Sequence, residues 1–259
     1  MNLHVNYRVL PPPHLLTTFL QDFTKSTPGR DFARLSRLFP ANWQAYIIGG
    51  LLRDLLLRRE RGMMMELADV DVVVAGASSM DSLRSRLGVT CLSINSFGGA
   101  KCQMRSGGVV FDVWRMEDHT NMSTAPKPPT IEQLLRHNLL DIDAILWDPR
   151  TGCLHEYGCQ QAVAAGRIDL VGDQGISQNL IAAQLAHVLI VKFKTGFKVS
   201  RRLREFMATA WETSRPEEVM QIIQRKLPNA RNQMDTLLED LPHGAAPLWT
   251  NRATTRTFS

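Results

Sequence analysis

Apolar and polar residues alternate along this chain in two different ways. Between about residues 46 and 114, short apolar runs end at glycines or charged residues, a pattern typical of buried strands joined to helices. From about residue 174 onward the pattern is helical throughout. The sequence therefore predicts an α+β fold, in which a mixed sheet with flanking helices precedes an all-helical domain.

The same pattern predicts individual elements and domain limits. Helices are expected at 15–23, about 32–38, about 79–87, 176–193, 200–211, 216–226 and 229–241. Ser78 or Ser79 can cap the helix near 79–87, and Thr130 with Gln133 forms a capping box that opens a short helix. The predicted domains are an N-terminal helical segment (1–43), an αβ head (44–125), its strand and hairpin extension (126–173), a helical domain (174–250) and a flexible tail (251–259).

One stretch of the head joins a glycine turn to an acidic strand. An apolar strand ends at Gly49-Gly50, a helix follows, and a second apolar strand opens with Asp69-Val70-Asp71. Successive strand side chains point to opposite faces, so Asp69 and Asp71 share one face. Neighbouring carboxylates repel unless a cation lies between them, and Mg²⁺ prefers one or two carboxylates together with phosphates and water. The stretch predicts a site for a metal-bound nucleotide, with Mg²⁺ or Mn²⁺ as the ion.

Candidates for phosphate binding lie around this turn. Gly49 and Gly50 let the backbone approach a triphosphate closely, and the helix that begins there offers unpaired N–H groups. Arg53 could bind a phosphate or pair with a carboxylate such as Asp54. Lys101 follows a second glycine-rich stretch and is a further phosphate candidate, the alternative being an ordinary surface lysine.

Two groups of residues resemble a known family. The run from Gly49 to Asp54 and the motif Asp69-Val70-Asp71 resemble the head domain of CCA-adding tRNA nucleotidyltransferases and bacterial poly(A) polymerases, within the DNA polymerase β superfamily. Residues 140–152 and 165–168 resemble the strand, hairpin and helix exit that follow in that family. The resemblance implies a polymerase β-like nucleotidyltransferase head with a helical neck. It also implies transfer of a nucleoside monophosphate from a nucleoside triphosphate to a hydroxyl group.

The chemistry of this superfamily requires a third carboxylate on a neighbouring strand. Asp112 fits, because it lies in an apolar run that follows the hairpin signal Gly107-Gly108. The resemblance then implies two metal ions, with Asp69 and Asp71 binding both. Asp112 would bind only the ion on the acceptor side, where it can also help to release the hydroxyl proton.

The chain departs from the family at positions expected to read the base. His137-Asn138-Leu139 stands where the family has an Arg-Arg-Asp run, and His187 and Ile190 stand where it has arginines. Metal chemistry is not touched by these changes. The residues therefore support nucleotidyl transfer but do not predict CCA addition.

Two further clusters have a structural interpretation. Asp141 and Asp143 form a second Asp-x-Asp motif, but no glycine turn precedes them, so they are expected as strand-start residues at the edge of the cleft. Cys153, His155 and Cys159 lack the closely spaced ligand pairs of zinc sites and are expected to be structural.

Charge favours a polyanionic partner without identifying it. The 259 residues carry a formal net charge of +5, and the sequence pI is near 9.2. The densest basic run could contact an RNA backbone or could be a solvated helix face; it comprises Lys192, Lys194, Lys198, Arg201, Arg202 and Arg204. Cysteines without paired spacing, the lack of an apolar run near ~20 residues and an N-terminus unlike a signal peptide predict a cytoplasmic protein without membrane contact.

Three functional hypotheses follow. The leading one is nucleotidyl transfer to the 3′ end of an RNA or tRNA. Because the helical part is short for the family, the acceptor could instead be a protein or a small molecule, as in a toxin or defence role. The third hypothesis is a non-catalytic nucleotide- or RNA-binding module, against which the presence of Asp69, Asp71 and Asp112 argues.

Overall fold

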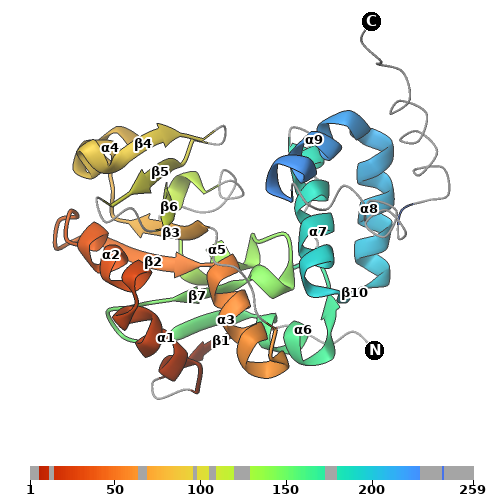
Figure 1. Ribbon diagram of the computed structural model, residues 1–259, viewed down its shortest axis with the longest axis horizontal. Helices are drawn as coiled ribbons and strands as arrows, with labels where there is room; N and C mark the ends of the chain where they lie inside the picture. Colours follow the sequence, from red (N-terminus) through yellow and green to blue (C-terminus); the bar gives the residue numbers. More distant parts are fainter. Residues whose placement is uncertain are drawn as a thin grey trace, which may run out of the picture. The chain divides into compact units, whose positions relative to one another are not determined.

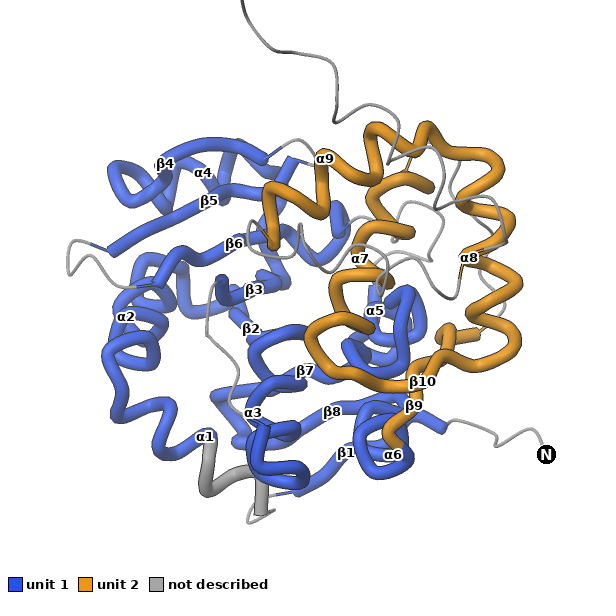
Figure 2. Tube along the Cα trace, turned by 45° about the vertical axis from the view of Figure 1, so that its right-hand side comes forward, with its two compact units in different colours: residues 1–165 blue, residues 166–259 orange. Residues whose placement is uncertain are grey.

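Two compact units make up the chain. The computed structural model describes residues 6–11, 15–63, 69–95, 98–104, 109–119, 129–172, 180–227 and 241, with 15–19 described by their backbone alone. The units are Met1–Ala165 and Gly166–Ser259 (Figure 2). The second unit begins before residue 174, where the helical domain is predicted, and it opens with a short strand. The finer domain limits stay predictions.

Unit 1 is built on an eight-stranded mixed sheet with the order β1-β8-β7-β2-β3-β6-β5-β4 (Figure 1). Among the described strands, neighbours are antiparallel except for the parallel pair β3 and β6. Residues at the start of β3 and of β6 therefore lie at the same end of the sheet. The strands are β1 (Tyr7–Leu10), β2 (Gln44–Ile48), β3 (Asp69–Ala75), β4 (Cys91–Ile94), β5 (Ala100–Gln103), β6 (Val110–Arg115), β7 (Ile145–Trp147) and β8 (Leu154–Tyr157).

The helices of unit 1 begin where the sequence provides caps. The Ser79 Oγ accepts a hydrogen bond of 3.0 Å from the backbone N–H of Ser82, and Thr130 and Gln133 bond each other reciprocally. Both predicted caps are confirmed. The helices are α1 (Leu15–Lys25), α2 (Thr27–Ser36), α3 (Gly50–Arg61), α4 (Met80–Leu87), α5 (Ile131–Arg136) and α6 (Cys159–Ala165), with 3₁₀ helices η1 (Gly88–Thr90), η2 (Met116–Asp118) and η3 (Asp141–Asp143).

One face of the sheet carries an apolar cluster that includes residues of α5. Its buried members are Tyr46, Ile48, Val73, Trp114, Met116, Leu134, Leu135 and Leu146. Asp71 lies two residues before Val73 on β3, and Asp112 lies two residues before Trp114 on β6, so both carboxylates share the face of the cluster. The apolar packing therefore fixes the two strands immediately beside these carboxylates.

Two local features differ from the sequence-based expectation. The segment 1–43 contains the edge strand β1 as well as helices, and Arg8 of β1 forms an ion pair with the fully buried Glu156 of β8. Residues Asp141–Asp143 form η3 before β7 and are not the start of a strand, because the N–H of Ala144 donates back to the carbonyl of Asp141 at 3.1 Å. The strand that follows begins at Ile145.

Over its described residues, 166–172, 180–227 and 241, unit 2 is helical apart from one pair of short strands. Its elements are β9 (Arg167–Ile168), α7 (Ile181–Thr195), β10 (Lys198–Val199), α8 (Arg201–Thr213) and α9 (Pro216–Lys226), with β9 and β10 parallel. Helix α7 packs against α8 and α9 through fully buried residues such as Leu185, Leu203 and Val219. The helices predicted at 200–211 and 216–226 are confirmed, whereas the prediction at 229–241 falls almost wholly, and the tail entirely, outside the described residues.

No helix in the described ranges is both long enough and apolar enough to cross a membrane.

Candidate functional site

The predicted acidic residues meet on one face of the sheet. Asp71 on β3 and Asp112 on β6 are direct partners in the register of the parallel pair, and Asp69 lies two residues before Asp71 on the same face. Lys101 on β5 is the direct partner of Asp112 on its other side. Asp71, Asp112 and Lys101 therefore form a row across three adjacent strands.

Both oxygens of the Asp112 carboxylate accept hydrogen bonds. The Lys101 Nζ lies 3.0 Å from Oδ2, and the Asn95 Nδ2 lies 3.0 Å from Oδ1. Asn95 is oriented in turn because its own Oδ1 accepts the N–H of Gly99 at 2.9 Å. The Asp112 side chain is 14% exposed and that of Lys101 is 33% exposed, so the pair is partly shielded from water. Lys101, a phosphate candidate from the sequence, is therefore paired with the carboxylate of Asp112.

The charges of all three aspartates act on Lys101. Burial lowers the pKa of Lys101, but the hydrogen bond and the charge of Asp112 raise it, and the charges of Asp69 and Asp71 raise it further. The net direction is upward, so the Lys101 ammonium stays protonated at neutral pH. One fixed cation, paired with Asp112, therefore lies within the electrostatic reach of all three carboxylates.

The glycine turn lies next to this row. Ile48, the last residue of β2, is the register partner of Asp71, and Gly49 follows it with φ 73° and ψ −126°. The Gly49 N–H donates to the carbonyl of Ile145 at 2.9 Å, and α3 begins at Gly50. The positive end of the α3 dipole is therefore placed beside the acidic residues, where it favours a bound anion.

The two glycines of the turn are expected to respond differently to substitution by alanine. Gly49→Ala forces a side chain into a positive-φ conformation and should lower the free energy of unfolding by about 1–3 kcal/mol. Gly50→Ala is the matched control, because a Cβ there meets only the Arg53 Nη2 at 3.5 Å and should change stability by less than about 1 kcal/mol. Urea denaturation of both variants measures the difference, and equal losses would contradict the strain.

The Arg53 side chain belongs to a buried cluster of ion pairs and is not placed as a phosphate ligand. Its Nε donates to Asp54 at 2.8 Å and its Nη1 donates to Asp143 of η3 at 2.6 Å. All three side chains are less than a tenth exposed. The sequence left open whether Arg53 binds a phosphate or pairs with a carboxylate, and in the structure it pairs with carboxylates. The second Asp-x-Asp motif supplies the distant partner, a role that the sequence did not reveal.

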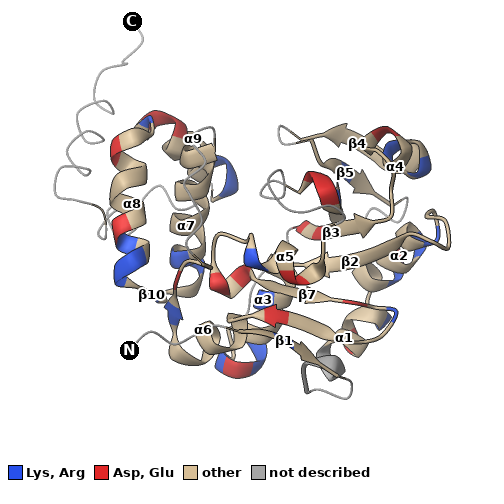
Figure 3. Ribbon diagram, turned by 180° about the vertical axis from the view of Figure 1, so that it is seen from behind, with Lys and Arg blue, Asp and Glu red and all other residues tan. Residues whose placement is uncertain are grey.

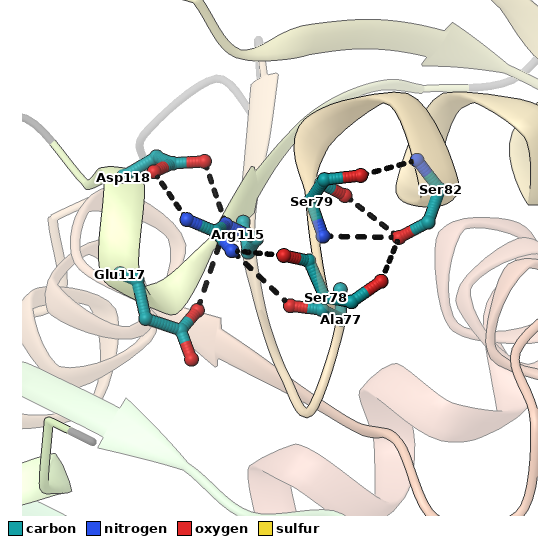
Figure 4. A network of polar contacts seen from close by, with 7 residues as sticks. All are labelled: Ala77, Ser78, Ser79, Ser82, Arg115, Glu117 and Asp118. Carbon is teal, nitrogen blue, oxygen red and sulfur yellow. Dashed lines mark hydrogen bonds and ion pairs between the residues drawn. The ribbon is translucent and has the colours of Figure 1, made fainter. Parts of the chain in front are cut away.

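A second arginine, Arg115, stabilises the C-terminal end of β6. Arg115 makes two 2.7 Å bonds to the carboxylate of Asp118 and donates to the carbonyl of Ser78 at 2.7 Å (Figure 4). It therefore ties β6 to the loop that follows β3. Because Asp71 and Asp112 lie on these two strands, this contact helps to maintain their register.

The basic run in unit 2 is divided between buried and exposed side chains. Lys192 is buried, and Arg202 donates to the backbone carbonyls of Leu170 and Gly172. Figure 3 shows the basic residues that open α8. The exposed members are Lys198, Arg201, Arg202 and Arg204, and Lys194 is half-buried. RNA contact by this run stays a prediction, and the exposed members are its best candidates.

The acidic side chains of the site supply only part of the coordination shell that a divalent ion needs. Within the described ranges, no group of three or more histidine, cysteine, aspartate or glutamate side chains is placed to hold a metal. Asn95 and Lys101 each donate to one oxygen of Asp112, which leaves each oxygen with a second lone pair for another ligand. Asp69 and Asp71 are hard donors on one face and fit a single Mg²⁺ that completes its shell with phosphate and water.

Solved structures with the same fold include CCA-adding enzymes and tRNA-processing enzymes. A CCA-adding enzyme in complex with ATP matches 92% of this chain at a TM-score of 0.62 and 16% identity. The Thermotoga maritima CCA-adding enzyme complexed with tRNA matches 91% at 0.60 and 16%. The chain shares the fold of CCA-adding enzymes. A tRNA-processing enzyme with CTP matches 83% at 0.54 and 21%.

The chain matches only part of each of these proteins, and at low sequence identity. The chain spans 54, 55 and 57% of the length of these three proteins. No protein-family model matches the sequence, and no curated protein matches it. The resemblance stated from the motifs is confirmed as a resemblance of fold, with a mixed α/β unit and a helical C-terminal region.

Proposed function

We propose that this chain is a metal-dependent nucleotidyltransferase that moves a nucleoside monophosphate from a nucleoside triphosphate to a hydroxyl group. The observation that carries the proposal is the register of β3 and β6, which sets Asp71 opposite Asp112, with Asp69 on the same face. The glycine turn at the start of α3 lies beside them. A sheet face with these carboxylates next to an anion-binding helix end suits a metal-bound triphosphate.

The proposed role of each residue follows from its position in the site. The N-terminal end of α3 would receive the negative phosphates, and Asp69 and Asp71 would hold Mg²⁺. When bound, this ion would polarise the phosphoryl group and offset its developing charge. In the overall reaction, the acceptor oxygen forms a bond to the α-phosphorus and its hydroxyl proton is released to water. The bond from that phosphorus to the bridging oxygen breaks, and pyrophosphate leaves with the bonding electrons. Arg53 and Arg115 take no direct part, because their guanidinium groups support the strands and helices that carry the site.

The favoured acceptor is the 3′ end of an RNA or tRNA. The neighbours in fold include structures with ATP, with CTP and with tRNA, which supports a nucleotide donor and an RNA acceptor. Exposed Lys198 and Arg201 in unit 2, together with the net charge of +5, are consistent with a polyanionic partner.

Transfer of label tests the function and separates the acceptors. The purified protein is incubated with each α-³²P-labelled nucleoside triphosphate, Mg²⁺ and either total cellular RNA or total cellular protein. Label in RNA supports the proposal as stated, and label in polypeptide redirects it to protein nucleotidylation. The Asp69→Ala, Asp71→Ala double variant gives the background level. If neither the incorporated label nor the released pyrophosphate exceeds that level, the enzymatic proposal fails and the hypothesis of a binding module remains.

A further inference from the structure

Two cysteines face each other across neighbouring strands at one edge of the sheet. Cys91 of β4 and Cys102 of β5 are direct partners in the antiparallel register, so their side chains lie on the same face. Directly opposite residues of antiparallel strands have Cα atoms about 4.5–5.5 Å apart, and disulfides join Cα atoms about 4.4–6.8 Å apart. Cys91 is the first residue of β4, and the register shifts between it and Ser93, so the pair lies at the end of the ladder. The backbone spacing therefore suits a bond between the two sulfurs.

The two thiols are free and lie in different surroundings. Cys102 is fully buried, whereas Cys91 is half-buried. Burial raises the pKa of the Cys102 thiol to about 12, and the charge of Cys91 and a hydrogen bond with it contribute to the rise. Cys102 is therefore protonated at neutral pH and shielded from reagents in water. Cys91 is the thiol of the pair that an oxidant can reach.

The pair lies on the strands that border the candidate site. β4 is the edge strand of the eight-stranded sheet and pairs with β5 (Figure 1). Lys101, the residue before Cys102, forms the ion pair with Asp112, and Asn95, the residue after β4, donates to the same carboxylate. A covalent bond between Cys91 and Cys102 would therefore hold together the two strands that position these donors.

We propose that Cys91 and Cys102 form a reversible disulfide that joins the edge strand β4 to β5 when the protein meets a hydroperoxide. This inference is independent of the proposed function. The spacing of the two cysteines in the sequence gives no sign of the pair, because only the hairpin of β4 and β5 brings them together.

The reaction has two steps. The Cys91 thiolate attacks one oxygen of hydrogen peroxide, the O–O bond breaks, and Cys91 becomes a sulfenic acid while the other oxygen leaves and is protonated to water. The Cys102 sulfur then attacks the Cys91 sulfur, the S–O bond breaks, and a second water leaves with the Cys102 proton. The two thiols together lose two electrons and two protons, and the peroxide is reduced. Exchange with a thiol reductant reverses the bond.

The first step also prepares the second. The negative charge of Cys91 is one cause of the raised pKa of Cys102, and this charge is absent from the neutral sulfenic acid. Cys102 therefore loses its proton more readily once Cys91 is oxidised.

Peptide mapping of the oxidised protein tests the inference. The folded native protein is treated with hydrogen peroxide, its remaining thiols are blocked with N-ethylmaleimide in denaturant, and it is digested with trypsin. Because trypsin cuts after Lys101, Cys91 and Cys102 fall in separate peptides that only a disulfide can join. These two peptides should be recovered linked, at about tenfold or more the level of any linked pair that includes Cys153. Free thiols should fall from four to two per chain, and dithiothreitol should restore all four.

Matched variants separate the roles of the two thiols. Cys102→Ser should leave Cys91 as a sulfenic acid that dimedone captures, whereas Cys91→Ser should give neither a linked peptide nor a dimedone adduct at buried Cys102. Cys153→Ser is the control, because Cys153 is also half-buried, and it should form the link as the native protein does. The inference is overturned if the folded native protein forms no link between Cys91 and Cys102, or if Cys91 joins Cys153 or a second chain instead. The native protein and Cys153→Ser decide this even if a variant of the pair does not fold.

Discussion

Asp71→Asn is expected to lower the rate of nucleotidyl transfer by about 1,000-fold, the size of loss seen when a preorganised charge-stabilising group is removed. Asp71 stands at the centre of the site, between the last residue of β2 and Asp112 of β6. Asparagine keeps the shape of the side chain and removes its negative charge. The protein should therefore stay folded and lose the ability to hold a divalent ion.

The measurement is the initial rate of transfer of α-³²P label, with the thermal unfolding temperature recorded for the same samples. Asp81→Asn is the matched control, because Asp81 is an aspartate on α4 whose side chain is 91% exposed. Its rate should stay within about twofold of the native rate, as expected for a surface change. An Asp71→Asn protein that keeps a tenth of the native rate would show that Asp71 does not hold the ion.

The common face of Asp69 and Asp71 was predictable from a local rule, and Asp112 was predictable because the family resemblance implies a third carboxylate on a neighbouring strand. Strand alternation places Asp69 and Asp71 on one face, and the hairpin signal before Val109 places Asp112 on a strand that can join them. The parallel register that sets Asp71 opposite Asp112 follows from strand pairing and could not be read from spacing. The motif therefore predicted which residues meet, and the sheet determined how they meet.

The partners of the two cationic side chains were not predictable to the same degree. Lys101 faces Asp112 only in the register that β5 and β6 adopt, and a slip of one residue would turn it to the other face. Arg53 finds Asp143 at a separation of 90 residues in the sequence, through the packing of α3 against η3. Propensity and spacing carry no information on such contacts, because only tertiary packing brings them together.

The strand β1 illustrates a different limit. It has four residues, lies next to prolines and forms one edge of the sheet. Its stability comes from pairing with β8 and from the ion pair of Arg8 with buried Glu156, neither of which is visible in the local sequence. Short edge strands of this kind depend on distant partners. The sequence of segment 1–43 therefore predicted its helices and not β1.

Arg53→Met is expected to lower the free energy of unfolding by about 3–5 kcal/mol, since it leaves buried carboxylates without their cation. Burial lowers the pKa of Arg53, but the charges of Asp143 and Asp54 outweigh burial and raise it, so the guanidinium is charged at every pH at which the protein would be studied. Methionine fills a similar volume and cannot donate to either carboxylate. The loss therefore reports the buried charges and not a cavity.

Urea denaturation of three variants separates this effect from ordinary surface pairing. Arg84→Met removes an arginine whose side chain is 51% exposed and lies 3.6 Å from Asp81, and it should cost no more than about 1 kcal/mol. Arg53→Met combined with Asp143→Asn should recover part of the lost stability, because one of the stranded charges is gone. If Arg53→Met unfolds like the native protein but binds nucleoside triphosphate at least tenfold more weakly, Arg53 is a phosphate ligand and the buried cluster is not what stabilises the turn.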